Sequence, residues 1–134
     1  MSMAETLQER IKGLFPDLLG VTFTDVTPDC IRAELNARDE ICTVPGIIHG
    51  GAVMGFADTL GAVATVLNME GGGRTTTIES KTNFFRALTS GGKVIGECTP
   101  LHKGRTTMVW QTRITDENGK LAAQVIQTQI VLPS

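Results

Sequence analysis

The sequence predicts an α+β fold in which a curved antiparallel sheet wraps around one long central helix. The segment "AVMGFADTLGAVATVL", residues 52–67, is almost wholly apolar and long enough for a buried helix. A helix that is apolar nearly all round has to be covered on most of its sides. Four segments separated by turn signals follow it, the first of them rich in β-branched and aromatic residues, which is typical of antiparallel strands. We therefore expect these strands to supply the cover.

The chain has 134 residues, of which 41% are hydrophobic and 19% are charged. This length and composition predict a single globular domain over residues 1–134. Ser2 and Glu5 have the spacing of a capping box, which predicts a short amphipathic helix near the start. We expect this helix to stop near Pro16, because proline has no backbone N–H to continue it.

Two strands are expected before the long helix, in "GVTFTDV" and "CIRAELNA", with "TPD" as the turn between them. In the second segment, Ile31, Ala33 and Leu35 alternate with polar residues. This period of two is the pattern of a strand with one face in water. The segment "RDEICTVPG" is expected to be a loop that leads into the long helix.

The long helix is expected to end at the glycines of "EGGGR", residues 70–74. The four strands after it are predicted in "RTTTIESKTNFF", "GGKVIGECTPLH", "RTTMVWQTRIT" and "KLAAQVIQTQIVL". Between the last two, Asn118-Gly119 suits a type I′ hairpin. Because the edge strands of such a sheet carry unpaired backbone groups, we also expect self-association.

Composition excludes several classes of function. A formal net charge of -2 offers no basic field to attract nucleic acid. Cys30, Cys42 and Cys98 are widely spaced, which argues against a disulfide framework or a metal site and favours a reducing compartment. The apolar segment is shorter than the roughly 20 residues of a membrane span. The segment "MSMAETLQERIKGLF" lacks the apolar region of a signal peptide, so we expect a cytoplasmic protein without membrane partners.

Asp58 is the only ionisable residue within the apolar segment. Burial of an ionised carboxylate without partners is costly, so its presence there calls for a reason. Two interpretations are open. Either Asp58 faces a gap filled by solvent or bonds a nearby amide, or it is a base or nucleophile in an apolar surround.

The tripeptide "HGG", His49 to Gly51, stands at the expected start of the same helix. Two glycines there leave backbone N–H groups unobstructed at the positive end of the helix dipole, which is a place that stabilises an oxyanion. The alternative is a tight turn from loop to helix and nothing more. An oxyanion site together with a lone carboxylate suggests acyl transfer.

The spacing of these groups predicts a dimer. Gly50 and Asp58 are eight residues apart, which on one helix is about 12 Å at roughly 1.5 Å per residue. A reacting carbonyl has to lie about 3 Å from both its donor and its attacker. One subunit cannot satisfy this, whereas two helices packed antiparallel about a two-fold axis would bring Gly50 of one to Asp58 of the other.

The segment "HGGAVMGFADTLG" resembles the helix start of hotdog-fold acyl-CoA thioesterases of the phenylacetyl-CoA and 4-hydroxybenzoyl-CoA type. The later "TTTIESKTNFFRAL" resembles the strand that follows the helix in this family, and the order of elements agrees over about residues 5–132. The resemblance implies a hotdog fold and hydrolysis of an acyl-CoA thioester. It also implies a homodimer, commonly paired into a homotetramer, with no cofactor besides the coenzyme A of the substrate.

The resemblance also implies roles for individual residues. Asp58 would be the general base or the nucleophile, and the Gly50 amide would be the oxyanion donor. His49 would shape the turn and contact the thioester, and Thr77 falls where relatives carry a hydroxyl that orients water. Thr43 stands where relatives often carry an Asn or Gln amide, and a hydroxyl has a shorter reach there. This departure puts the efficiency in doubt more than the reaction.

Coenzyme A brings phosphates, which basic side chains bind. The residues expected to hold the substrate come from the basic turn "HKGR", the end of the strand after the helix and the helix start: His102, Lys103, Gly104, Arg105, Arg86 and Gly51. The acyl group, aryl or medium-chain, would lie in a chamber lined by residues such as Met54, Phe56, Leu60 and Val63. Core or pocket-wall positions are expected for Phe84, Phe85 and Trp110.

Two other functions are kept open. One is an enoyl-thioester hydratase or dehydratase on the same fold, with His49 and Asp58 as an acid–base pair. The "HGG" turn suits oxyanion binding better than this chemistry. The other is a protein that binds acyl-CoA without turning it over.

Overall fold

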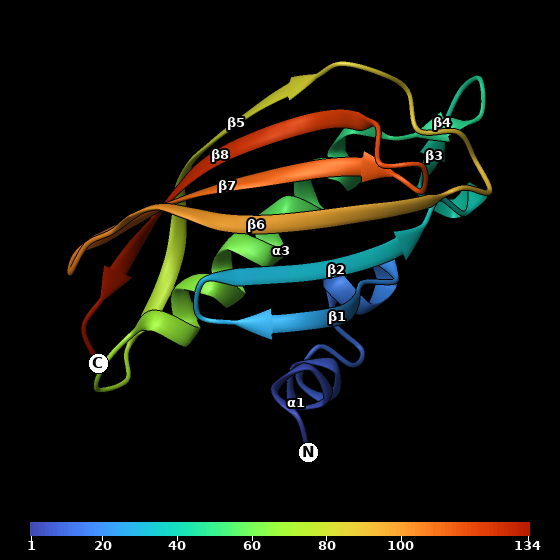
Figure 1. Ribbon diagram of the computed structural model, residues 1–134. Coiled ribbons are helices and arrows are strands. Elements are labelled where there is room, and N and C mark those ends of the chain that lie inside the picture. The colour runs from blue at the N-terminus through green and yellow to red at the C-terminus, as the bar shows by residue number, and fades with distance from the viewer.

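A six-stranded antiparallel sheet curves along one side of helix α3 in the computed structural model, which describes residues 1–134 (Figure 1). The helical elements are α1 (Met3–Arg10), α2 (Phe15–Leu19), the 3-10 turn η1 (Asp39–Ile41) and α3 (Gly50–Asn68). The strands are β1 (Thr22–Thr27), β2 (Cys30–Asn36), β3 (Cys42–Thr43), β4 (Ile47–Ile48), β5 (Arg74–Phe84), β6 (Lys93–Lys103), β7 (Thr107–Asp116) and β8 (Leu121–Leu132).

The strand order in the sheet is β1-β2-β6-β7-β8-β5, and β3 and β4 form a separate two-stranded hairpin. The chain enters the sheet with β1 and β2, crosses it as α3 and returns at the far edge as β5, beside β8 (Figure 1). The predicted order of helix, two strands, long helix and four strands is confirmed, but the segment "RDEICTVPG", expected to be a loop, contains η1 and β3. The edge strands β1 and β5 each have one strand partner, and the outer side of each pairs with no strand of the subunit.

The inner face of the sheet packs on α3. Phe56 and Leu60 are fully buried and lie over Gly96 of β6, where a Cβ would stand 2.8 Å from Leu60 Cδ1 and 2.9 Å from Phe56 Cζ. The Trp110 indole is also fully buried and donates from Nε1 to Thr65 Oγ1 at 2.8 Å. The expectation that Trp110 belongs to the core is confirmed.

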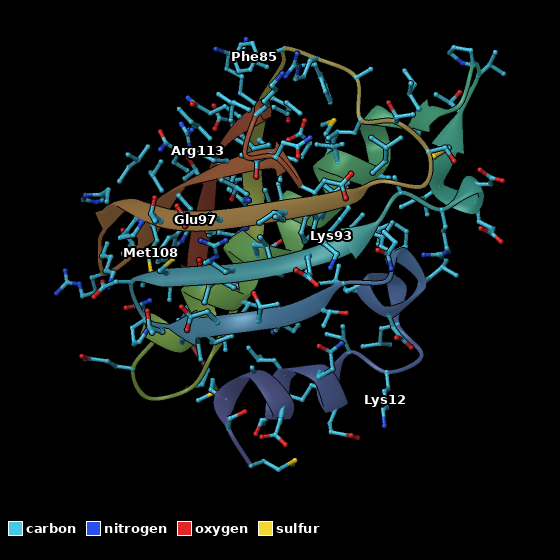
Figure 2. The ribbon with its side chains drawn as sticks, turned by 45° about the vertical axis from the view of Figure 1, so that its right-hand side comes forward. Lys12, Phe85, Lys93, Glu97, Met108 and Arg113 are labelled. Atoms are coloured by element: carbon cyan, nitrogen blue, oxygen red, sulfur yellow. The ribbon has the colours of Figure 1, made fainter.

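The outer face of the sheet is polar. Arg32 of β2 pairs with Glu97 of β6 at 3.1 Å, and Lys93 pairs with Glu34 at 3.2 Å. Glu97 and Lys93 stand on this face in Figure 2, away from α3. The sheet therefore has the one-sided pattern that the alternation in β2 predicted.

Helix α3 is covered by the sheet on one side and by α2 beside Gly55, and part of its surface stays open. Along the side turned away from the sheet, Met54 is 39% exposed and Val66 48% exposed, although both are apolar. By length and composition α3 could cross a membrane, but in this fold it is the core helix of the sheet. The sequence predicted that most sides of α3 are covered, whereas within a single subunit 44% of the helix is buried.

A β-bulge interrupts the edge strand β5 between Thr77 and Glu79. Ile78 and Glu79 are both exposed in succession, so the alternation of side chains changes phase there. Thr77 points inward before the bulge, and Ser80 and Thr82 are the half-buried residues after it. The bulge thus lies next to the hydroxyl that faces α3.

Pro16 does not stop a helix, which corrects the sequence prediction. Helix α1 ends at Arg10, and Pro16 lies in the first turn of the separate helix α2. The missing N–H of proline costs nothing in a first turn, where backbone donors have no helical acceptor. The capping box at Ser2 and Glu5 is confirmed, with both of its hydrogen bonds formed.

The hairpin at Asn118-Gly119 is confirmed, but its predicted turn type is wrong. A type I′ turn needs positive φ at both central residues, and only Gly119 has it, at 82°. Asp116 Oδ1 instead accepts from the backbone N–H groups of Asn118 and Lys120, at 2.9 and 3.0 Å. These bonds hold a longer loop, and the one from Lys120 lowers the pKa of Asp116 most.

The three cysteines are unpaired. Cys98 lies in the core, where burial raises the pKa of its thiol to about 12. Cys30 and Cys42 are half-buried.

Candidate active site

The start of α3 is held in place by the loops around it. The backbone N–H of His49 donates to the Ile41 carbonyl at 2.9 Å, and the N–H of Ile48 donates to the Leu88 carbonyl at 2.8 Å. These bonds come from two segments far apart in the sequence. They fix the direction in which the first N–H groups of the helix point.

His49 caps α3 and leaves one glycine N–H free. Its Nδ1 accepts from the Gly51 N–H at 2.8 Å, so the neutral ring carries its proton on the exposed Nε2. The sequence suggested two unobstructed donors here, but the Gly51 N–H is already used. The Gly50 N–H has no acceptor within the subunit, and it stands at the positive end of the helix dipole.

Asp58 lies two turns further along the same helix, on its exposed side. The carboxylate is half-buried, and Thr77 of β5 donates to its Oδ1 at 2.5 Å. Its Oδ2 makes no hydrogen bond within the subunit. The carboxylate of Asp58 therefore lies outside the core. The opposite side of α3 is the one that is buried in the core.

Two glutamines of β8 stand behind Asp58, and the sequence prediction missed both. Gln127 and Gln129 are completely buried, at 0% exposure. Gln127 Nε2 donates to the carbonyl of Ala57, the residue before Asp58, at 2.8 Å. Gln129 Nε2 donates to Thr77 Oγ1 at 2.6 Å. The sequence pattern that could have revealed them is the occurrence of two glutamines at alternate positions of a strand whose other residues on that face are apolar.

Gln127 approaches α3 closely because Gly61 has no side chain. A Cβ at Gly61 would lie 2.3 Å from Gln127 Cδ, far inside any real contact. The glycine therefore permits the hydrogen bond that ties β8 to the helix beside Asp58.

Two pockets flank the first turn of α3. One has a volume of about 430 Å³ and is lined by residues that include Thr43, Gly50, Val53, Phe84 and Arg86. The other has a volume of about 320 Å³. Its lining residues include Phe15, Leu18, Cys42, His49 and Gly51. Several of the expected site residues thus meet at the helix start.

Comparison with known proteins identifies the family. The model of the thioesterase superfamily matches residues 45–123, more than half of the chain. The chain is 31% identical over 128 residues to the 1,4-dihydroxy-2-naphthoyl-CoA hydrolase of Escherichia coli, covering 96% of this chain and 93% of that protein. It belongs to the thioesterase superfamily.

Other relatives of this thioesterase agree. Proofreading thioesterase EntH of Cronobacter sakazakii is 33% identical over 116 residues, covering 87% of this chain and 84% of that protein. The crystal structure of a mutant thioesterase from Pseudomonas aeruginosa aligns with a TM-score of 0.94 at 28% identity, over 100% of this chain and 96% of the other. The predicted hotdog fold, family and enzyme class, thioester hydrolase, are confirmed.

The thioesterase keeps its basic turn away from the helix start within one subunit. Lys103 Nζ pairs with Asp29 Oδ1, in the turn between β1 and β2. Pro28 of the same turn accepts from Asn68 Nδ2 at the end of α3, at 2.8 Å. His102, Lys103, Gly104 and Arg105 therefore lie near the C-terminal end of α3 and Gly50 lies at the other end, whereas Arg86 lines the pocket beside Gly50.

The expected lining of an acyl chamber needs correction. Phe56 and Leu60 are fully buried against the sheet, so neither lines a chamber, while Met54 remains on the exposed side. Phe84 and Phe85 are 53% and 58% exposed and line the pocket beside Gly50. Phe85 projects away from the sheet at the end of β5 (Figure 2). Because α3 is apolar on nearly all sides, its residue spacing does not reveal which side the sheet covers.

We predict that Gly61→Ala destabilises this thioesterase. The new methyl group would force Gln127 away from the Ala57 carbonyl, and overpacking of this kind costs about 1–3 kcal/mol. Thermal unfolding should show a lower Tm than in the parent protein. Gly55→Ala, on the same helix, is the control, because its methyl group meets the exposed Phe15 ring at 3.0 Å and the end of the Leu19 side chain at 3.4 Å, both far longer than the 2.3 Å at Gly61. Equal Tm values for the two variants would contradict the prediction.

Proposed function

We propose that this thioesterase hydrolyses an aryl or medium-chain acyl-CoA at a site shared by two subunits of a cytoplasmic homodimer, which pairs further into a homotetramer. One observation carries the proposal: the free Gly50 N–H and the Asp58 carboxylate stand on one continuous helix. Their separation is about 12 Å at roughly 1.5 Å per residue. The two groups cannot reach the same carbonyl, so a second copy has to supply one of them.

The open side of α3 and the open edge β5 fit such a copy. Met54 and Val66 lie on the same exposed side of α3 as Asp58, and Ile78 at the bulge of β5 is 56% exposed. An antiparallel partner helix would cover this apolar side and bring its own Gly50 to Asp58. A sheet edge with unpaired backbone groups favours the same pairing.

The proposed reaction begins with the thioester carbonyl oxygen bound to the Gly50 N–H, beside His49 Nε2–H. Asp58 of the facing subunit either takes a proton from a water that attacks the carbonyl carbon or attacks that carbon itself. The negative charge that develops on the oxygen is stabilised by the N–H and the helix dipole. The carbon–sulfur bond then breaks, and the coenzyme A thiolate leaves and takes up a proton. If Asp58 is the nucleophile, a water then hydrolyses the acyl–Asp58 anhydride, which releases the free acid and restores the carboxylate.

An aryl or medium-chain acyl group is supported by the size and lining of one pocket and by the named substrate of one relative. The pocket lined by Phe15, Leu18 and His49 is largely apolar and has a volume of about 320 Å³. The relative from Escherichia coli is by name a hydrolase of 1,4-dihydroxy-2-naphthoyl-CoA, an aryl thioester. Thr43 lines the pocket beside Gly50 and is exposed, so its hydroxyl is available to the substrate carbonyl or the water.

We predict that Asp58→Asn and Asp58→Ala lower kcat on acyl-CoA substrates by about 10²–10⁴-fold, the usual contribution of a general acid–base group. Steady-state hydrolysis of a panel of aryl and medium-chain acyl-CoAs measures this. The control is Asp25→Asn, an exposed carboxylate on the opposite edge strand β1. Parent-like activity in both Asp58 variants would show that the assigned role is wrong.

The coenzyme A phosphates are assigned to Arg86 and, from the facing subunit, to the basic turn. In an antiparallel dimer the C-terminal end of one α3 lies near the N-terminal end of the other. Lys103 is already paired with Asp29, whereas Arg105 is exposed and makes no ion pair. Arg105 is therefore the better phosphate ligand of the turn.

We predict that Arg105→Ala raises KM for an acyl-CoA by about two- to fivefold and leaves kcat unchanged, the scale of one exposed charge-assisted contact. The same acyl group on N-acetylcysteamine, which has no nucleotide, should show no change in KM. Lys120→Ala, in the hairpin between β7 and β8, serves as the control. An equal rise in KM for both substrates would contradict the phosphate assignment.

A further inference from the structure

Gln127 and Gln129 form a buried polar pair on β8, the strand between β7 and β5 (Figure 1). Buried amides are unfavourable unless every polar group is bonded, and an apolar pair would fill the same space at lower cost. No amide oxygen or nitrogen of the pair lacks a hydrogen-bond partner. The bond from Gln127 to the Ala57 carbonyl and the bond from Gln129 to Thr77 connect the pair to the two neighbours of the Asp58 carboxylate. The pair therefore calls for a reason beyond packing.

The donor and acceptor of each hydrogen bond in this network follow from the bond to the Ala57 carbonyl. The Ala57 carbonyl can only accept, so Gln127 turns its Nε2 to it, at 2.8 Å, and presents its Oε1 to Gln129. Gln129 therefore turns its Nε2 to that oxygen, at 2.6 Å. The Thr75 Oγ1 lies 2.9 Å from the remaining Oε1 of Gln129 and 2.8 Å from the Ile130 carbonyl, and its one proton is shared between these two acceptors.

The second N–H of Gln129 then decides what Thr77 does. It donates to Thr77 Oγ1 at 2.6 Å, so this oxygen acts as an acceptor on that side. A threonine hydroxyl has only one proton. That proton is directed to Asp58 Oδ1, 2.5 Å away, which leaves Asp58 Oδ2 free.

We propose that Gln129 is a positioning residue for the reaction: it directs the Thr77 hydroxyl at Asp58 and so holds the carboxylate with Oδ2 turned toward the attacking water or the thioester. This inference rests on the proposed function, because it needs Asp58 to be the catalytic group. Gln129 itself touches neither substrate nor Asp58. It acts only through Thr77, and Gln127 fixes its orientation from the helix.

Removal of the Gln129 amide frees the Thr77 hydroxyl to rotate among its staggered positions and to donate elsewhere. The carboxylate then loses a charge-assisted hydrogen bond and its fixed orientation in the reacting complex. Substrate affinity should change little, because neither glutamine lines a pocket of the site. The expected signature is a fall in kcat with KM preserved.

The test is a double-mutant cycle with Gln129→Met and Thr77→Val on an acyl-CoA substrate. Each single variant should lower kcat about tenfold, the equivalent of one hydrogen bond to a charged group, with KM changed by less than about twofold. Because Gln129 acts through Thr77, Gln129→Met should cost nothing more in the Thr77→Val background. Thr77→Ser, which keeps the hydroxyl, should retain most of the activity.

The control for the strand is Gln124→Met, because Gln124 lies on β8 outside this hydrogen-bond network. If Gln129→Met is too unstable to assay, Gln129→Asn, whose shorter amide cannot reach Thr77, carries the same prediction. Parent-like kcat in the assayed Gln129 variant, or losses that multiply in the double variant, would overturn the positioning role.

Asp58→Asn, measured in parallel, separates this inference from the proposed function. If Asp58→Asn retains full activity, the proposed function fails and the inference fails with it. If Asp58→Asn is inactive while Gln129→Met is fully active, only the inference is overturned.

Discussion

The rigidity of a single helix is the constraint on which the rest of this account depends. Gly50 and Asp58 belong to one unbroken α3, so their separation is set by helical geometry and cannot close by local motion. An oxyanion donor and an attacking group have to meet at one carbonyl. Under the proposed function, dimerisation is therefore a condition of the chemistry as well as a way to cover apolar surface.

The same helix explains why a carboxylate occurs in the most apolar segment of the chain. The sheet buries Phe56 and Leu60 on one side of α3, and Asp58 emerges on the other side, next to the edge strand β5. It is hydrogen-bonded from behind by Thr77 and open in front. The helix thus buries its apolar side against the sheet, while Asp58 is bonded by Thr77 through Oδ1 and leaves Oδ2 free for the reaction.

The sequence predicted the elements that local rules control and missed those that depend on distant contacts. Spacing located the capping box of α1, and alternation, composition and turn signals located the segments of the six long strands along the chain. Pro16 was assigned to a helix end because proline occurs both after the end of a helix and in the first turn of the next one. The partner of Gln127 is a carbonyl 70 residues away in the chain. No local pattern predicts that contact, nor that His49 uses the Gly51 N–H.

The most direct test of a shared site is complementation between inactive subunits. Gly50→Pro removes the donor, and proline suits this first helical position because His49 before it is extended, at ψ 136°. Asp58→Asn removes the carboxylate. Each variant alone should be inactive. Subunits unfolded and refolded together should recover about one quarter of parent activity, because half of the dimers are mixed and each has one intact site. No activity above that of the separate variants would contradict the account.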